Sequence, residues 1–274
     1  MTTELVLEPG RIERNYWRDL WRYRELFQVL ARRDVSIRYR QTAVGVLWAV
    51  LRPLLTMAIF TVVFSRIAKL PSEGAAPYAL MVFAGMLPWM FFSTALSEAS
   101  NSLVSNANLI SKVYFPRLIV PTATIVVALI DFLICAVIFA LMMVWYRFVP
   151  TWRVALLPLF VAMAFLAALG PGLWITAVNV KYRDFRFVIP FIVQIGLYVS
   201  PVGFSSSVVP ESWRFVYALN PMVGVIDGFR WCLLGGEAPL YWPGFAASLA
   251  LIAAFLWIGV RQFRAMERTF ADII

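Results

Sequence analysis

Long apolar runs separated by short polar connections set the pattern of this chain of 274 residues. An α-helix rises ~1.5 Å per residue, so about 20 apolar residues are needed to cross the ~30 Å hydrocarbon core of a bilayer. Stretches that approach or exceed this length occupy residues 43–65, 77–96, 118–146, 154–178, 187–204 and 242–260. The pattern therefore predicts an all-α integral membrane protein with six transmembrane helices.

Residues 14–31 predict an amphipathic helix ahead of the first span. Apolar and aromatic residues recur every three or four positions on one helical face, with Arg14, Arg18 and Arg22 beside them. Helices that combine aromatic rings with arginines are typical of the membrane interface. An ordinary helix packed on the cytoplasmic side of the bundle is the alternative.

Residues 205–239 differ from the spans on either side. They contain two apolar pieces, 208–219 and 222–234, which are divided by Asn220-Pro221 and are each too short to cross a bilayer. We expect two short re-entrant helices before the last span, because irregular backbone at this depth is tolerated only where protein or water shields it.

These patterns divide the chain into three parts. Residues 1–42 form a polar N-terminal segment without the apolar core of a secretory signal, residues 43–260 form the membrane domain, and residues 261–274 form a tail. Within the membrane domain, 98–117 is an inside loop with an amphipathic pattern, which could rest on the membrane or dock into a partner.

Charge placement predicts the orientation of the spans. With both termini in the cytoplasm, 17 of the 24 Lys and Arg residues lie inside and six outside, while Arg52 lies within the first span. This distribution fits the positive-inside rule. The net charge of +9 therefore indicates topology and contact with anionic lipid headgroups, and we expect no nucleic-acid partner.

Missing residue types narrow the possible chemistry. The chain has no histidine, which excludes His-based metal sites and a Ser-His-Asp triad. Its two cysteines, Cys135 and Cys232, are not spaced as a metal pair, and no lysine lies in a GxxxxGK[ST] loop. We expect a chain that is not itself an enzyme and binds no metal or cofactor, so another subunit would hydrolyse any nucleotide that drives it.

Charged residues at membrane depth are candidates for function. Arg52 and Asp131 lie within spans, and an ionised group at mid-bilayer costs at least a few kcal/mol unless it faces protein or water. The two could pair across helices, or each could line a polar passage. Asp227 and Arg230, three positions apart, could neutralise each other.

Short motifs in a fixed order add a resemblance to this pattern. They are Arg38-Tyr39-Arg40-Gln41, Leu47-Trp48, Leu51-Arg52-Pro53-Leu54, Lys112-Val113-Tyr114-Phe115-Pro116-Arg117, Pro121, Asn179-Val180-Lys181-Tyr182-Arg183-Asp184, Ser200-Pro201-Val202, Val209-Pro210, Asn220-Pro221 and Arg230. In order and spacing, over most of residues 30–260, the chain resembles permeases of ABC transporters that export O-antigen, capsular polysaccharide or teichoic acid. Arg52 is a departure, since such permeases often carry Asn there.

The resemblance implies a homodimer that sits on two cytoplasmic ABC ATPase subunits, which bind the ATP and magnesium. The substrate would be an undecaprenyl-type lipid-linked polysaccharide, most often O-antigen, which crosses the bacterial inner membrane through a channel at the homodimer interface. It also implies that residues 101–112 form a coupling helix, that 208–234 close the outer end, and that the 14–31 helix lies beside the substrate's entrance.

Four groups of candidate residues follow. Aromatic rings stack on sugars without holding any one unit tightly, so the proposed substrate path comprises Trp48, Arg52, Phe60, Trp89, Phe92 and Asp131, with core packing as the alternative for each ring. Charge-assisted hydrogen bonds to the lipid pyrophosphate are expected from Arg32, Arg33, Arg38, Tyr39 and Arg40. Contact with the ATPase is expected from Asn106, Leu109, Lys112, Arg183 and Asp184. The outer gate is expected to comprise Trp213, Asn220, Pro221, Asp227 and Arg230.

Three other interpretations compete with this one. The same plan could serve an ABC permease for small amphiphiles. An integral-membrane enzyme acting on lipid-linked sugars would need clustered carboxylates, but the outside acids Glu73, Glu211, Asp227 and Glu237 show no paired spacing. A structural anchor would leave the two short helices and the intramembrane charges without a purpose.

Overall fold

The computed structural model describes residues 16–39, 43–182, 184–235 and 240–270, and within these ranges it contains helices but no strand. The α-helices are α1 (Tyr16–Arg22), α2 (Arg24–Tyr39), α3 (Ala43–Phe60), α4 (Tyr78–Ser105), α5 (Ala107–Lys112), α6 (Ile119–Trp145), α7 (Leu157–Lys181), α8 (Phe185–Val199), α9 (Glu211–Tyr217), α10 (Pro221–Leu233) and α11 (Trp242–Met266). A π-helical segment, Thr61–Ile67, extends α3, and short 3₁₀ segments lie at Trp152–Leu156, Ser206–Val208 and Glu267–Thr269. Arg40 and Arg183, both predicted site residues, lie outside the described residues.

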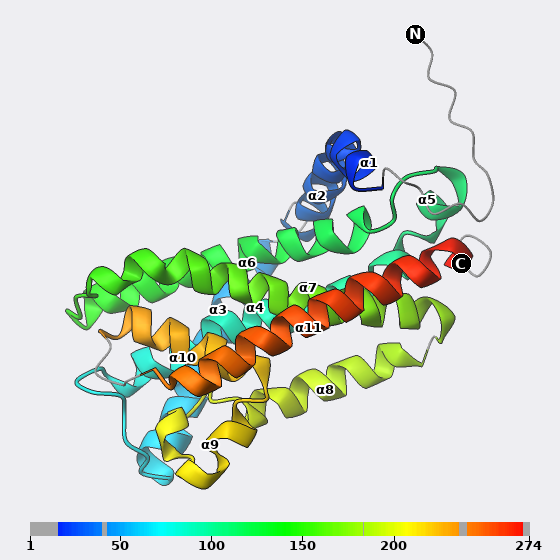
Figure 1. The fold of residues 1–274 in the computed structure, drawn as a ribbon. Coiled ribbons are helices and arrows are strands. Elements are labelled where there is room, and N and C mark those ends of the chain that lie inside the picture. Colours follow the sequence, from blue (N-terminus) through cyan, green and yellow to red (C-terminus); the bar gives the residue numbers. More distant parts are fainter. Residues whose placement is uncertain (1–15, 40–42, 183, 236–239, 271–274) are drawn as a thin grey trace.

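Five helical segments in the described part of the chain are long and apolar enough to cross a membrane. They are Val50–Ile67, Tyr78–Ser105, Ile119–Trp145, Trp152–Lys181 and Trp242–Thr269. These five correspond to five of the six predicted spans and make the chain an all-helical, multi-pass membrane protein. The long helices lie roughly side by side (Figure 1).

The remaining predicted span, 187–204, is shorter than expected. It is represented by the mostly apolar helix α8, whose 15 residues extend only about 22 Å. The helix ends at Val199 because Ser200 precedes Pro201, and a proline disfavours helical backbone in the residue before it. Ser200 accordingly has extended backbone, with φ −84° and ψ 152°.

The predicted cytoplasmic helix over 101–112 is divided. α4 continues nine residues beyond the predicted end of its span, to Ser105, and Ala107–Lys112 forms the separate helix α5. The break falls at Asn106, whose backbone leaves the helical region at φ −109° and ψ 23°.

Helix α4 is at the centre of the bundle. In its most apolar stretch 78% of the residues are buried, against 33% or less in the other four candidate spans. It packs against α6, α7 and α10, and α7 packs in turn against α11. The α7–α11 contact is close because each helix contributes a glycine: a Cβ on Gly170 would lie 2.6 Å from the Leu256 nitrogen, and one on Gly259 would overlap the Gly170 carbonyl.

The N-terminal helices pack on one side of the bundle, chiefly against α6, and bury Tyr16 and Leu30 there. α1 and α2 project from one side near the end that carries α5 and the C-terminus (Figure 1). Trp17 and Trp21 are 61% and 72% exposed. This geometry agrees with a helix that lies at the interface and leaves its aromatic rings free for lipid.

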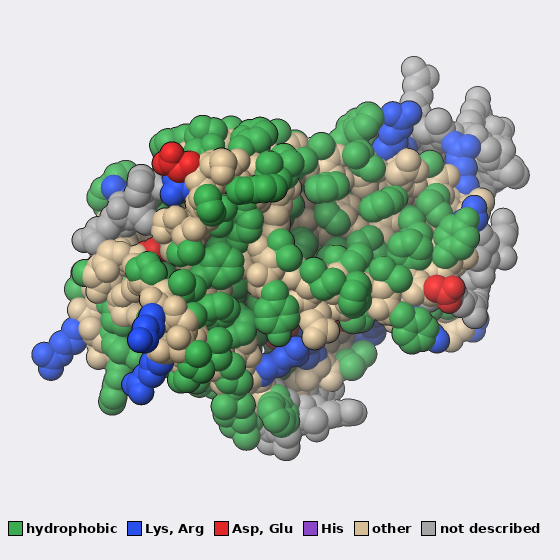
Figure 2. Space-filling view, turned by 90° about the horizontal axis from the view of Figure 1, so that it is seen from below, with side chains coloured by type: hydrophobic (Ala, Val, Ile, Leu, Met, Phe, Trp, Pro, Cys, Tyr) green, Lys and Arg blue, Asp and Glu red, His purple; other side chains and the backbone are tan. Residues whose placement is uncertain are grey.

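Figure 2, the face seen from below, shows apolar side chains over most of the surface, with Lys and Arg gathered mainly toward the two ends and one edge. This is the distribution of a surface that meets hydrocarbon in the middle and water or headgroups at its ends.

The close α7–α11 contact makes a prediction about stability. Gly259→Ala should lower the free energy of unfolding by roughly 1–3 kcal/mol, because the two helices must separate to admit a methyl group. Gly172→Ala is the matched control: its Cβ would lie 3.5 Å from the Ala99 Cβ, so stability should hold or rise by up to about 1 kcal/mol. Titration with SDS in mixed micelles measures both. Equal effects of the two substitutions would contradict the packing described.

Candidate functional site

An inner cluster of Arg38, Tyr39, Glu98 and Asp131 joins three helices. Arg38, at the end of α2, places Nη1 2.8 Å from Asp131 Oδ2 of α6 and pairs through Nη2 with Glu98 of α4. The Tyr39 hydroxyl donates to Asp131 Oδ1. The three charged side chains are between 26% and 31% exposed, so the cluster is largely withdrawn from solvent.

This cluster gives Asp131 a partner other than the predicted one. It pairs with Arg38 and not with Arg52, so one arginine offsets two carboxylates. Burial, and then the hydrogen bond to Asp131, raise the pKa of Tyr39 above its ordinary value, which keeps the phenol a protonated donor. Arg38 and Tyr39 thus fasten α2 to the bundle.

A second contact joins α2 to the break between α4 and α5. Arg33 Nη2 donates to Asn106 Oδ1 at 2.7 Å, and Asn106 Nδ2 donates to the Ser102 carbonyl at 2.8 Å. Arg33 also pairs with its neighbour Asp34. Movement of α5 would therefore act directly on α2.

The other residues predicted for pyrophosphate and ATPase contact lie on the surface. Arg32, Lys112 and Asp184 are exposed, and Leu109 is half-buried. α5 and the connection between α7 and α8 lie at the same end of the bundle (Figure 1).

The chain beyond α11 returns to the N-terminal helix, a contact that the sequence did not indicate. Glu267 Oε1 accepts from the Tyr16 hydroxyl at 3.2 Å and from the Arg117 backbone nitrogen at 2.7 Å. Arg264 Cζ lies 4.6 Å from the centre of the Tyr16 ring. Burial, followed by the charge of Glu267, raises the pKa of Tyr16 well above its usual range. No local pattern predicts a contact between residues 251 positions apart.

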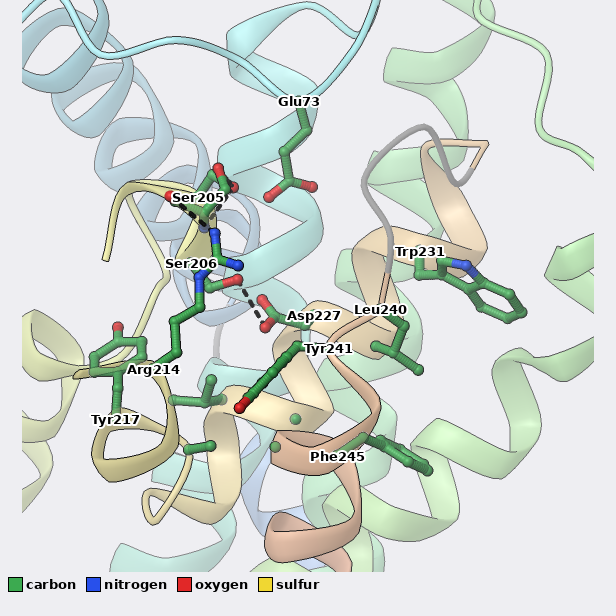
Figure 3. Close-up of a pocket in the computed structure, with 15 residues that line it drawn as sticks. Glu73, Ser205, Ser206, Arg214, Tyr217, Asp227, Trp231, Leu240, Tyr241 and Phe245 are labelled. Atoms are coloured by element: carbon green, nitrogen blue, oxygen red, sulfur yellow. Dashed lines mark hydrogen bonds between the residues drawn. The ribbon is translucent and has the colours of Figure 1, made fainter. Parts of the chain in front are cut away.

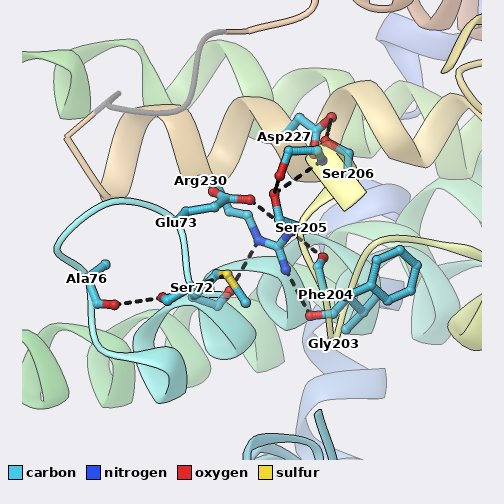
Figure 4. A network of polar contacts seen from close by, with 12 residues as sticks. Ser72, Glu73, Ala76, Gly203, Phe204, Ser205, Ser206, Asp227 and Arg230 are labelled. Carbon is cyan, nitrogen blue, oxygen red and sulfur yellow. Dashed lines mark hydrogen bonds and ion pairs between the residues drawn. The ribbon is translucent and has the colours of Figure 1, made fainter. Parts of the chain in front are cut away.

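At the opposite end, an outer cluster surrounds Arg230 of α10, which is 1% exposed (Figure 4). Its guanidinium donates to the backbone carbonyls of Met81, Val202 and Phe204 at 3.2, 3.0 and 2.8 Å, and lies 3.4 Å from Glu73 Oε1. A buried charge is tolerated when it is paired and its donors are satisfied, as they are here.

Local sequence builds this outer cluster. Asn220 begins α10 by accepting from the Met222 nitrogen at 3.0 Å, and Pro221 fits the first helical turn because its missing N–H would have no partner there. A Cβ on Gly85 of α4 would lie 2.8 Å from Arg230 Nη2, so the glycine leaves room for the guanidinium.

The predicted Asp227–Arg230 pair is replaced by two separate partnerships. Arg230 takes Glu73, and Asp227 Oδ2 accepts from the Ser206 hydroxyl at 2.8 Å. Trp213 of α9, also predicted to lie at the gate, is 63% exposed.

The residues predicted for the substrate path fall into two groups. On α3, Trp48 is 57% exposed and Arg52 is exposed. Phe60 and Trp89 are buried in the monomer, and Phe92 packs on Trp89 with ring centres 5.5 Å apart. Gly196 of α8 approaches Trp89 so closely that an added Cβ would lie 2.5 Å from Cη2.

Long apolar spans and charges paired within the bundle define a multi-pass integral membrane protein. Comparison with known families makes this specific: residues 25–234 match the family described as ABC-2 type transporter, and the chain belongs to it.

Similar proteins cover almost the whole chain. An O-antigen export system permease protein, RfbA, of Myxococcus xanthus is 28% identical over 259 residues, which are 94% of this chain and 98% of the relative. RfbA of Klebsiella pneumoniae, which carries the same description, is 22% identical over 260 residues, which are 91% of this chain and 95% of the relative.

The inner cluster makes a second stability prediction. Arg38→Met leaves the carboxylates of Glu98 and Asp131 facing each other without a counter-charge, which should cost roughly 1–3 kcal/mol of unfolding free energy. Combining it with Glu98→Gln and Asp131→Asn should restore much of this loss. Arg32→Met, an exposed control on the same helix, should change stability by less than about 0.5 kcal/mol. SDS titration gives all three values, and an Arg38→Met effect no larger than the control would contradict the pairing.

Proposed function

We propose that this chain is the permease subunit of an ATP-driven exporter that moves lipid-linked polysaccharide, O-antigen in kind, across the bacterial cytoplasmic membrane. Two copies would enclose a channel, and two ABC ATPase subunits beneath them would supply the ATP, magnesium and hydrolysis. Family membership supports the transporter class, and the relatives named as O-antigen export permeases support the substrate.

The exposed position of Arg52 on α3 is the main support for a channel at the interface between two copies. The residue lies within the candidate span Val50–Ile67, of which only 11% is buried, and the ion pairs of the described residues do not include it. Arg52 is the third residue of this span, and a charge inside a span is costly wherever it faces hydrocarbon instead of water, headgroups or protein. The exposed face of α3 should therefore meet water or a second copy of the chain rather than lipid. With Trp48 on the same helix, it offers a cation and an aromatic ring to a passing glycan.

The proposed topology counts α8 as a short fifth span. Six crossings then place both termini in the cytoplasm, with the inner cluster, α5 and the Glu267 contact at that end, in agreement with the excess of inside Lys and Arg. At the outer end, α9 and α10 have seven and 13 residues, lengths that suit re-entrant helices closing a channel.

Export would begin at the inner interface. Arg32 is exposed on α2 and could hold a pyrophosphate, whereas Asp34 and Asn106 already engage Arg33 and two carboxylates occupy Arg38. Lys112 and Asp184 would contact the ATPase. The Arg33–Asn106 hydrogen bond then gives a path by which ATP-driven movement of α5 shifts α2 and opens the entrance.

Reconstitution tests the proposal. The chain would be co-expressed with the ATPase encoded beside it, placed in nanodiscs, and assayed for mass and ATP hydrolysis with lipid-linked polysaccharide or with small amphiphiles. We expect a complex of two plus two subunits whose hydrolysis the polymer stimulates. Lys112→Glu should weaken the complex, whereas Lys69→Glu, a charge reversal placed at the outer end by the proposed topology, should not.

Two other results would contradict the exporter proposal or change its substrate. A folded chain that binds no ATPase would overturn the exporter. Stimulation by amphiphiles but not by polysaccharide would assign the same permease plan to small substrates instead.

A further inference from the structure

A pocket of about 110 Å³ opens beside the outer cluster, between α9, α10, the start of α11 and the Ser205–Ser207 turn (Figure 3). Its lining is mixed: Asp227, Tyr217, Tyr241 and Arg214 supply polar groups, and Phe245 supplies an apolar wall. Tyr241 is 37% exposed, so the pocket reaches the surface.

Two polar atoms of this pocket's side chains are buried and have no hydrogen-bond partner: Asp227 Oδ1 and the Tyr217 hydroxyl. They come from different helices, α10 and α9. Leaving a buried acceptor or donor unpaired costs about 1–3 kcal/mol, so such atoms call for an explanation. Burial, with the charge of Asp227 adding to it, raises the pKa of Tyr217 above its ordinary range, and the phenol remains a donor.

The charges around the pocket disfavour an ion as its occupant. Arg214, whose guanidinium donates to the carbonyls of Val209 and Ser207, and the neighbouring Arg230 oppose a cation. The carboxylates of Asp227 and Glu73 oppose an anion. Within the described residues, no group of three or more acidic or thiol side chains could hold a metal. A neutral ligand with several hydroxyls avoids both conflicts.

The geometry points to a site for one neutral sugar unit: we propose that this pocket binds a single pyranose of the glycan at the outer end, with a sugar hydroxyl donating to Asp227 Oδ1 and a sugar oxygen accepting from Tyr217. Phe245 and Tyr241 would take the apolar face of the ring. The inference deepens the proposed function and rests on it for the choice of ligand class.

The pocket admits part of one unit and no more. Its volume of about 110 Å³ is below the ~150 Å³ of a cavity known to hold benzene, and a pyranose has about twice as many heavy atoms as benzene, so one edge of the ring would enter while the rest stays in water. A chain of sugars could place the edge of one ring in the pocket while its neighbours stay in water. Such a site would hold the emerging polymer weakly enough to release it, unit by unit.

Binding to the full chain in phosphatidylcholine nanodiscs tests this inference, because these lipids contain no headgroup polyol. The probes are methyl α-D-mannoside, methyl α-D-galactoside and N-acetyl-D-glucosamine at millimolar concentration, detected by saturation-transfer NMR, with calcium chloride and inorganic phosphate as competitors. We expect at least one sugar to bind, and neither competitor to displace it.

Variants connect that binding to the pocket. Asp227→Asn and Tyr217→Phe should each weaken binding about tenfold, the effect of one lost hydrogen bond of about 1.4 kcal/mol. Tyr217→Phe should not lower the unfolding temperature, because the hydroxyl it removes has no partner in the empty pocket, whereas Asp227→Asn also removes a charge that interacts with Arg230. Glu211→Gln, an exposed control on α9 outside the lining, should leave both quantities unchanged.

The inference is overturned if no sugar binds, if calcium or phosphate displaces the sugar, or if both pocket variants bind as the unaltered chain does. It is also overturned if Tyr217→Phe unfolds at a lower temperature than the control, since the hydroxyl would then have a structural role. These results are separate from the exporter test. Sugar binding without an ATPase complex would support the sugar site and contradict the exporter proposal. A polymer-stimulated complex without sugar binding would support the exporter proposal and contradict the sugar site.

Discussion

Pairing of charge inside a low-dielectric bundle is the constraint on which the rest of this structure depends. Two arginines on neighbouring helices reach opposite ends of α4: Arg38 of α2 pairs with Glu98, and Arg230 of α10 donates to the Met81 carbonyl. These α4 residues are 17 positions apart, about 25 Å along the helix. Because an unpaired charge at either place would be costly, α4 is the central element to which the N-terminal helices and α10 are both attached.

The same constraint explains why α3 stands out. It is apolar enough to span, yet it carries the exposed Arg52 and contributes little to the core. In the proposed homodimer, a water-filled passage beside a second copy would surround this charge. The contacts of Arg33 with Asn106 and of Glu267 with Tyr16 lie on segments that the proposed ATPase could move, whereas α4 is the most deeply buried candidate span. A closely packed centre would let such an exporter open without losing its fold.

Much of the fold could be predicted from the sequence because hydropathy over 20 residues is a local signal. Five spans and the division at Asn220-Pro221 follow from it, and the Ser200-Pro201 step that shortens α8 is equally visible in the sequence. The ion-pair and hydrogen-bond partners of the charged side chains were harder to predict. Asp131 pairs within the bundle, but its partner Arg38 is 93 positions away, and helix register decides that pairing. Glu73 and Glu267 lie in short connecting segments with no periodic pattern, so nothing marked them as partners. Phe60 and Trp89, predicted for the channel wall, are buried in the structure. The sequence could not distinguish the two roles, because aromatic rings serve packing and sugar contact equally well.

The passage of glycan along α3 is the central claim, and site-specific photocrosslinking tests it most directly. Trp48 on α3 and Trp257 on α11 are similarly exposed, at 57% and 62%, and each would be replaced by p-benzoyl-L-phenylalanine in membranes that export radiolabelled lipid-linked polysaccharide. The account predicts that illumination links the glycan to position 48 and leaves position 257 at background. Equal labelling at both positions, or labelling at 257 alone, would contradict it.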